Sequence, residues 1–148
     1  MKNILLGFIV VVPMALSASD LIIKTGELGV NETISKIEKI VESKAKSGLG
    51  VFTIIDHKKG ADKVKLKLAD TKVILFGNPK IGTKLIQQDP LTAIDLPLKV
   101  LVYSKNNVTQ IVYRDLTKWS KNFKLEGSMM IGKIVKALDD ITTKASQK

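Results

Sequence analysis

Residues 98–113 contain a pattern that predicts two adjacent antiparallel strands. Two runs of apolar, β-branched and aromatic residues, 98–103 and 108–113, flank the polar segment 104–107. Strand-forming runs separated by a few turn-forming residues are typical of a β-hairpin. A hairpin of this kind places the chain among folds with an antiparallel sheet.

Four further segments are predicted as strands. Residues 21–24 form a short apolar run, and residues 73–76 form an apolar run that predicts a central strand. Residues 51–55 are almost entirely apolar and are therefore expected to form a strand that is buried over most of its length. Residues 63–68 alternate lysine with an aliphatic residue, which predicts a short edge strand with a charged outer face.

Two longer segments have the periodicity of amphipathic helices. The first is predicted to begin at an Asn31 N-cap and to end at Gly48, and the second to run for about 17 to 20 residues near the C-terminus. A third, shorter helix is predicted to begin with Asn78 and Pro79 and to end before Pro90. The apolar positions of the two long helices are Ile34, Ile37, Val41 and Ala45, and Met130, Ile131, Ile134, Leu138 and Ile141.

The order of these elements predicts an α+β fold. It runs strand, helix, three or four strands with a short inserted helix, and a long helix, which indicates one antiparallel sheet with helices packed on one face. The other face needs a cover, and we expect Tyr103, Tyr113 and their apolar neighbours to leave part of it available to a partner or ligand. No linker, repeat or composition break divides residues 20–148, so these residues are expected to form a single domain.

Residues 1–19 have the pattern of a secretory signal peptide. One lysine supplies the positive charge, residues 4–12 form an uncharged apolar run, and small residues cluster before Asp20. A retained membrane anchor is the alternative, but Pro13 interrupts the apolar stretch, and a span needs about 20 residues. We therefore expect a periplasmic or secreted protein that has no stable membrane anchor after cleavage of the signal near Asp20.

Cysteine and histidine content limits the chemistry. The 148 residues include no Cys and one His. The lack of Cys excludes thiol nucleophiles, disulfides, Cys-ligated zinc and iron–sulfur clusters. A single His cannot supply a two-His metal site within one chain, so no metal site is predicted and the cofactor stays unassigned. A haem or metal held by His57 from each of two subunits is the one such arrangement that a dimer permits.

The charge is strongly positive, with 24 Lys+Arg against 14 Asp+Glu and a formal net charge of +10. Nucleic-acid binding favours clustered arginines and interleaved aromatic residues. Here Arg114 is the only arginine, and the lysines are spread through every predicted element. The pattern therefore predicts a solvated lysine-rich surface and no nucleic-acid partner, with at most a weak attraction to anionic membrane surfaces.

Three ordered motifs resemble the Domain of Unknown Function 302 family. They are residues 51–57, which read VFTIIDH, residues 76–80, which read FGNPK, and residues 95–100, which read DLPLKV. The resemblance covers nearly the whole chain after residue 20. It implies the TATA-box-binding-protein-like arrangement β-α-β(4)-α, often as a dimer, but not DNA binding. The chain departs from the family at residues 113–116, where Tyr-Arg-Asp-Leu replaces Tyr-Asn-Asp-Pro.

His57 and the start of the third helix are the candidate functional residues. His57 ends a predicted strand, and histidine is the residue type most often used as a general acid or base, with Asp115 the best candidate for an acidic partner. The alternative is that His57 bonds the backbone of the turn that follows. Asn78, Lys80 and Thr83 surround a helix N-terminus with free N–H groups, which suits an anion or carboxylate. The alternative there is a purely structural start, with Asn78 as N-cap.

These features leave three hypotheses for function. The first is a small exported binding or accessory protein, a homodimer that holds a small ligand between its sheet and the His57 and Asn78 loops. The second is an enzyme in which His57 acts as general base beside Asp115, with an anion held near Lys80. The third is a structural module that docks on an envelope partner through its sheet face. No nucleophile–base pair or carboxylate pair is recognisable, so the enzyme is the less favoured reading.

Overall fold

A computed structural model describes residues 20–125 and 127–148. Five strands form one antiparallel sheet in the order β1-β5-β4-β3-β2. The expected α+β architecture is confirmed, whereas the predicted signal peptide, residues 1–19, lies outside the described residues. The strands are β1 (Leu21–Gly26), β2 (Gly50–Asp56), β3 (Thr71–Gly77), β4 (Leu98–Lys105) and β5 (Val108–Arg114).

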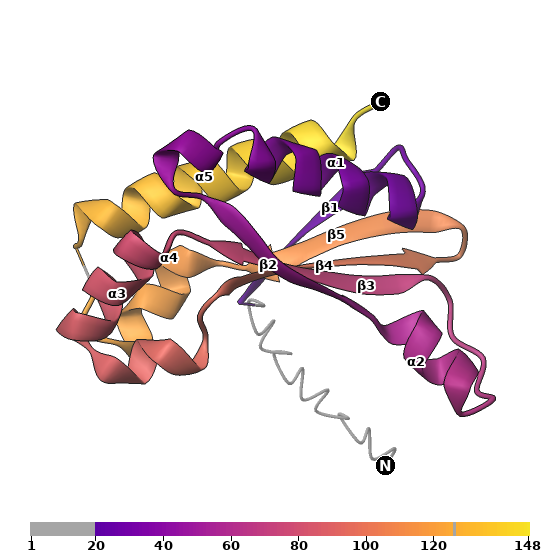
Figure 1. Ribbon diagram of the computed structural model, residues 1–148, viewed down its shortest axis with the longest axis horizontal. Coiled ribbons are helices and arrows are strands. Elements are labelled where there is room, and N and C mark those ends of the chain that lie inside the picture. The colour runs from indigo at the N-terminus through magenta and orange to yellow at the C-terminus, as the bar shows by residue number, and fades with distance from the viewer. Residues whose placement is uncertain (1–19, 126) are drawn as a thin grey trace, which may run out of the picture.

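The helices are distributed unevenly around the sheet. The two longest cover one face together, while α3 and α4 lie at one end of the sheet and α2 projects from the other end (Figure 1). The α-helices are α1 (Val30–Glu42), α2 (His57–Lys63), α3 (Pro79–Gln88), α4 (Leu116–Trp119) and α5 (Met129–Ser146). Short 3-10 turns are η1 (Ala45–Ser47), η2 (Pro90–Ile94) and η3 (Ser120–Asn122).

The predicted hairpin is present as β4 and β5. Lys105 pairs with Val108, so the connection is the two-residue turn Asn106-Asn107. Both asparagines have positive φ, 52° and 62°, which is the backbone of a type I′ turn. This turn matches the right-handed twist of the strands, and asparagine adopts it at low cost.

The hydrophobic core lies between the sheet and the helices α1 and α5. Ile34, Ile37 and Val41 of α1 pack into it as one stripe, and the strands contribute alternate residues. Ala45, the last apolar position predicted for the first helix, lies in η1 after the end of α1 and is exposed. Completely or almost completely buried members of the core are Ile37, Val41, Ile74, Phe76, Val100, Val102, Ile111, Leu138 and Ile141.

A polar cluster joins the edge strand β1 to α5. Lys24 Nζ lies 2.6 Å from Asp139 Oδ1 and also donates hydrogen bonds to Thr142 Oγ1 and Thr143 Oγ1. Tyr113 donates its hydroxyl hydrogen to the same Asp139 oxygen at 3.1 Å. The Lys24 ammonium holds the pKa of Asp139 below its usual value, and the Tyr113 hydrogen bond acts in the same direction. Tyr113 therefore faces the helices, not the open face that the sequence suggested.

Three local expectations are wrong. The first helix begins at Val30 after a Gly29 N-cap, not after Asn31, because the Glu32 carboxylate accepts a hydrogen bond from the Gly29 N–H. Gly48 closes η1 instead of α1, with a φ of 85°. Strand β2 is not buried over most of its length, because it is the outer strand of the sheet and has a neighbour on one side only.

Residues 63–68 do not form the predicted edge strand. Lys63 ends α2, and the chain then folds back on that helix. Lys65 has a φ of 59°, and the Leu66 N–H donates a hydrogen bond to the Ala61 carbonyl at 3.0 Å. A left-handed residue breaks the alternation that an extended strand needs.

The sheet face opposite α1 and α5 carries an apolar row across all five strands. The registers align Ile55 with Val73, Val73 with Leu101, Leu101 with Val112, and Val112 with Ile23. Ile23 is 57% exposed at one end of this row, and Ile55 is also exposed at the other. The row lies outside the main hydrophobic core, in which none of these five residues takes part.

Candidate functional site

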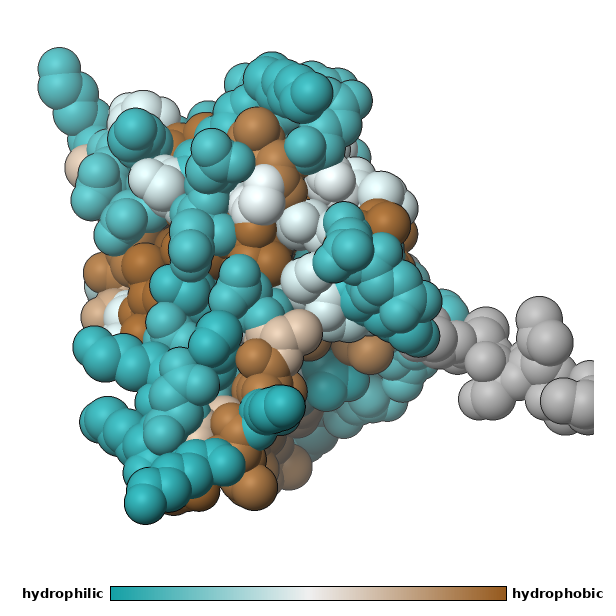
Figure 2. Space-filling model, turned by 90° about the vertical axis from the view of Figure 1, so that its right-hand side faces the viewer, coloured by the Kyte–Doolittle hydropathy of each residue, from teal (hydrophilic) through white to brown (hydrophobic). Residues whose placement is uncertain are grey.

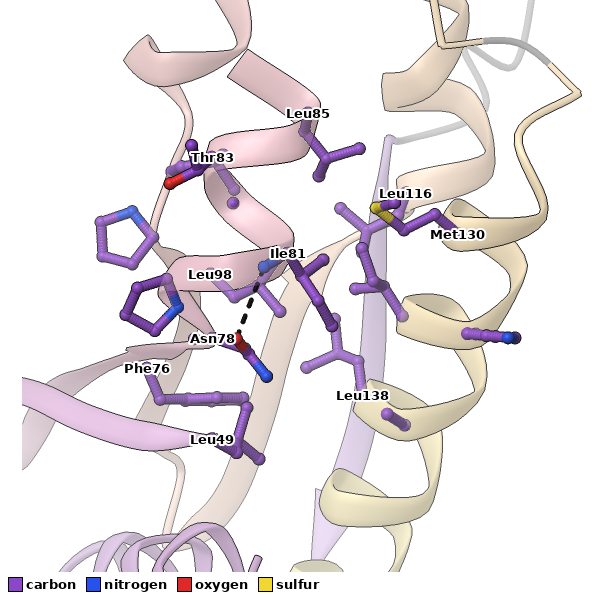
Figure 3. Close-up of a pocket in the computed structure, with 18 of the residues that line it drawn as sticks. Leu49, Phe76, Asn78, Ile81, Thr83, Leu85, Leu98, Leu116, Met130 and Leu138 are labelled. Carbon is purple, nitrogen blue, oxygen red and sulfur yellow. Dashed lines mark hydrogen bonds between the residues drawn. The ribbon is translucent and has the colours of Figure 1, made fainter. Parts of the chain in front are cut away.

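A cavity of about 400 Å³ lies at the end of the sheet, between α3 and α5. Ile81 and Leu85 of α3 and Met130 and Leu138 of α5 lie on facing sides of it (Figure 3). Phe76 at the end of β3 adds an aromatic ring from the sheet. The lining is almost entirely apolar, because the amphipathic faces of two helices and the end of a strand converge there.

The start of α3 is positioned by the Asn78 side chain. Asn78 Oδ1 accepts hydrogen bonds from the N–H groups of Lys80 at 3.0 Å and Ile81 at 3.4 Å, as in an N-cap (Figure 3 marks the second). Asn78 Nδ2 donates to the Ser47 carbonyl at 2.8 Å, which ties α3 to the turn before β2. A side chain at position 48 would collide with this amide, because a Cβ added to Gly48 would lie 2.9 Å from Asn78 Nδ2.

The anion-binding site expected at the start of α3 has no free N–H groups. Asn78 Oδ1 and the Asn78 carbonyl accept the hydrogen bonds of Lys80, Ile81 and Gly82, and Pro79 has no N–H to offer. The structural alternative, in which Asn78 caps the helix, accounts for the motif. Gly82 is not needed for close packing, because a Cβ there would meet Leu96 only at an ordinary 3.9 Å.

The polar side chains around the cavity are Asn78, Thr83 and Lys133. Asn78 uses both of its polar atoms in structural hydrogen bonds. Thr83 and Lys133 are exposed residues of α3 and α5. Lys80, the remaining candidate from this segment, does not line the cavity. The structure therefore brings Asn78 and Thr83 to one apolar cavity that also has a lysine at its boundary.

His57 lies far from that cavity. It is the first residue of α2 and is exposed, at the end of β2 opposite to Gly50. Gly50 pairs with Gly77, so His57 is separated from Asn78 by the length of β2, roughly 20 Å at about 3.3 Å per residue. The structure therefore does not bring the His57 and Asn78 loops to one ligand.

Asp115 does not accompany His57 either. It is the N-cap of α4, and its carboxylate accepts hydrogen bonds from the Thr117 N–H at 3.0 Å and the Thr117 hydroxyl at 2.6 Å. The Thr117 hydroxyl is the main cause of a lowered pKa for Asp115. Asp115 follows β5 at the same sheet end as Asn78, so the proposed pairing of His57 with Asp115 as base and acid has no geometric basis.

Trp119 and Asp95 form a contact that no pattern in the sequence predicts. Trp119 lines the cavity, and its Nε1–H donates a hydrogen bond to Asp95 Oδ2 at 2.8 Å. The indole also packs against Phe123, with ring centroids 5.0 Å apart. This bond satisfies the polar atom of a buried tryptophan and fixes the ring as part of the wall. No local sequence signal links two residues in such different segments.

Neither a metal cluster nor a membrane-spanning helix is found in the part of the chain that the structure describes. Within residues 20–125 and 127–148, no three His, Asp or Glu side chains gather in a way that could hold a metal ion. No helix in the same residues is long and apolar enough to cross a bilayer.

The sheet, the two helices on one face and the cavity at one end define a small α+β domain with one hydrophobic core. The family described as "Domain of unknown function DUF302" matches residues 22–144, and the chain belongs to this family. A crystal structure of an uncharacterised conserved DUF302 protein from Bacillus stearothermophilus has the same fold, with a TM-score of 0.71 and 22% sequence identity. The superposition covers 86% of this chain and 99% of that one.

Two curated relatives are named as ion channels. The fluoride-specific ion channel FluC 1 of Brucella suis biovar 1 is 41% identical over 93 residues, which are 62% of this chain and 35% of that protein. FluC 2 of Brucella melitensis biotype 1 matches at the same identity over 33% of its length. The chain thus spans about a third of the length of these relatives.

Proposed function

We propose that the protein is an exported binding protein for a small apolar molecule, which it holds in the cavity between α3 and α5. The observation that carries this proposal is the cavity itself. Its volume of about 400 Å³ falls within the range of small-molecule sites, roughly 300–1,000 Å³. An apolar wall offers few hydrogen bonds to water inside the cavity. The transfer of an apolar ligand from bulk water into the cavity is therefore favourable in free energy.

The ligand class follows from the distribution of polar groups. Ile134 and Ala137 continue the apolar wall along α5, and Lys133 of the same helix is the charged residue at the cavity. A molecule with an aliphatic or aromatic body and one polar or anionic end fits this arrangement, because the body fills the cavity and the end remains near the ammonium group. A strongly polar substrate finds few hydrogen-bonding partners there.

Blocking the cavity tests the proposal. Ala137→Phe places a ring where Ala137 lines the wall, and we expect it to abolish binding of a fluorescent probe such as anilinonaphthalene sulfonate. Gly132→Phe is the matched control, because Gly132 is an exposed residue of the same helix with no atom within 4 Å of its added Cβ. His57→Ala, at the other end of β2, is also expected to leave binding unchanged. Probe binding that survives Ala137→Phe would contradict the proposal.

Export and self-association complete the proposal. The signal-like residues 1–19 support secretion, and the intact mass of periplasmic protein tests it, since the secreted form is expected to begin near Asp20. The apolar row from Ile55 to Ile23 supports a homodimer in which each copy covers the open sheet face of the other. An envelope partner on the same face is the competing occupant.

A further inference from the structure

The segment between β2 and β3 projects from the body of the protein. It consists of α2 and residues 64–70, and it leaves the sheet at the end away from the cavity (Figure 1). We call residues 57–70 the projecting segment. Asp56 anchors its base, because the carboxylate accepts a hydrogen bond from the Lys59 N–H at 2.8 Å and pairs with Lys72 Nζ at 3.0 Å. At its other end, the Asp70 carbonyl accepts a hydrogen bond from the Ser104 N–H.

The projecting segment presents aliphatic side chains to solvent. Val64 is 65% exposed, Leu66 is 66% exposed and Leu68 is 42% exposed. They are within five residues of one another, and the fold-back of Leu66 onto Ala61 keeps this stretch close to α2. Single exposed aliphatic residues are ordinary on a protein surface, whereas a clustered set marks an interaction site. Figure 2 shows hydrophobic residues in brown among hydrophilic ones on this side of the molecule.

Lysines surround these aliphatic residues. The segment has two acidic residues, Asp62 and Asp70, and Asp62 is paired with Lys58 at 3.0 Å. Its five lysines therefore exceed its acidic residues and leave a net positive charge. The five are Lys58, Lys59, Lys63, Lys65 and Lys67.

We propose that the projecting segment docks the protein on the surface of an anionic phospholipid bilayer. Val64, Leu66 and Leu68 enter the headgroup region, and the lysines lie against the lipid phosphates. Aliphatic side chains and lysines that emerge together match the two components of a bilayer interface, apolar boundary and negative surface charge. An acidic protein surface would match the lysines but not three exposed aliphatic residues. Docking through the projecting segment leaves the cavity accessible, because the cavity lies at the other end of β2.

Vesicle co-sedimentation tests the proposal. The sample is the protein in the form that cells export, and an intact-mass measurement defines its N-terminus. The vesicles are phosphatidylcholine alone, or phosphatidylcholine with about a third phosphatidylglycerol. The wild type is expected to bind the anionic vesicles and to dissociate as salt is raised. Replacement of Lys59, Lys63 and Lys67 by Gln is expected to weaken binding roughly fivefold per lysine, on the order of 100-fold in total.

Matched variants separate the projecting segment from the general charge of the protein. The first control replaces three exposed lysines in and after α1 by Gln, namely Lys39, Lys44 and Lys46. It removes the same charge from another part of the surface and is expected to weaken vesicle binding less than about fivefold. For the apolar component, Val64→Ser with Leu66→Ser is expected to weaken binding at least about tenfold. Leu91→Ser with Ile94→Ser, two exposed apolar residues of η2, is expected to have no effect.

Four results would overturn the proposal. They are a wild type that binds no anionic vesicles, equal losses in the two lysine variants, equal losses in the two serine variants, and dissociation of a dimer by Val64→Ser with Leu66→Ser. The last result, read by light scattering, would show that a second copy covers the segment. Melting midpoints close to that of the wild type confirm that the variants are folded, as exposed positions lead us to expect. Failure here leaves the cavity proposal intact, because the probe experiment reports on the other end of the sheet.

Discussion

At the scale of single residues, Asn78 shows how a motif that suggested ligand binding supports the fold instead. Its amide caps α3 and also bonds to the carbonyl of Ser47, so one side chain holds two segments together. The cavity wall formed by α3 depends on this placement. Asn78 therefore affects any ligand through the position of the helix, and its own polar atoms are already engaged.

Asn78→Ala is expected to lower the free energy of unfolding by about 1–2 kcal/mol, because the variant loses an N-cap and leaves the Ser47 carbonyl without this donor. Urea denaturation measures the change. Thr83→Ala, at an exposed position on the same helix, is the control and is expected to alter stability by less than about 0.5 kcal/mol. Equal stability of Asn78→Ala and the wild type would show that the cap contributes nothing.

Acidic pH is expected to destabilise the protein through three carboxyl groups. The Lys59 N–H and Lys72 lower the pKa of Asp56, the Thr117 hydroxyl lowers that of Asp115, and Lys24 lowers that of Asp139. A carboxyl whose pKa is lower in the folded state stabilises the fold above its unfolded pKa of about 4. That contribution disappears as the pH falls through the lowered folded value.

Thermal melting from neutral pH down to about pH 2 measures this dependence. We expect a midpoint that is nearly constant above about pH 5 and falls steadily below about pH 4. Asp139→Asn is expected to be less stable than the wild type at neutral pH and to show a shallower fall in acid. A wild-type midpoint that rises on acidification would contradict the three assignments.

At the scale of elements, replacement of a glycine by alanine is expected to have opposite effects on stability in a helix and in a turn. Gly132 lies in α5 with no atom within 4 Å of an added Cβ, whereas Gly48 has a φ of 85° and faces Asn78 Nδ2. Gly132→Ala is expected to raise the free energy of unfolding by about 0.5–1 kcal/mol. Gly48→Ala is expected to lower it by at least about 1 kcal/mol, because a left-handed backbone is unfavourable for alanine.

Both variants are measured by the same denaturation experiment, so each serves as the comparison for the other. If Gly48→Ala were as stable as the wild type, the turn before β2 would not require its left-handed residue. A destabilised Gly132→Ala would contradict the open space that the structure shows around this position of α5.

At the scale of the whole molecule, the proposed self-association concerns the open sheet face. The homodimer proposal predicts a dimer by light scattering at micromolar concentration. Ile23→Lys with Ile55→Lys places a charge at each end of the apolar row and is expected to give a monomer with an unchanged fold, since both side chains are exposed. Leu91→Lys with Ile94→Lys, exposed residues outside the sheet, is expected to stay dimeric.

A wild type that is monomeric at all accessible concentrations would contradict the homodimer. It would favour the alternative in which an envelope partner covers the same face. A dimer that persists in the Ile23 and Ile55 variant would instead move the interface away from the apolar row.

Short-range patterns predicted the elements whose structure depends on neighbouring residues. The hairpin from Leu98 to Arg114, the start of α3 at Asn78 and the length of α5 follow from turn chemistry, caps and periodicity, which act over a few residues. The resemblance to the DUF302 family supplied the expected fold in the same way, from motifs that are read directly in the chain.

Local patterns in the chain therefore predicted the fold class, most elements and the core-facing stripes of the two long helices, but not the face on which Tyr113 lies. Contacts formed in the tertiary structure place β2 at the edge of the sheet, fold residues 64–69 back on α2, and put His57 and Asn78 at opposite ends of β2. The cavity could not be predicted from local patterns either, because an apolar helix face has the same sequence pattern whether it packs against another helix or lines a cavity. Strand order and helix spacing arise from contacts between distant segments, and local patterns carry no information about which distant segments meet.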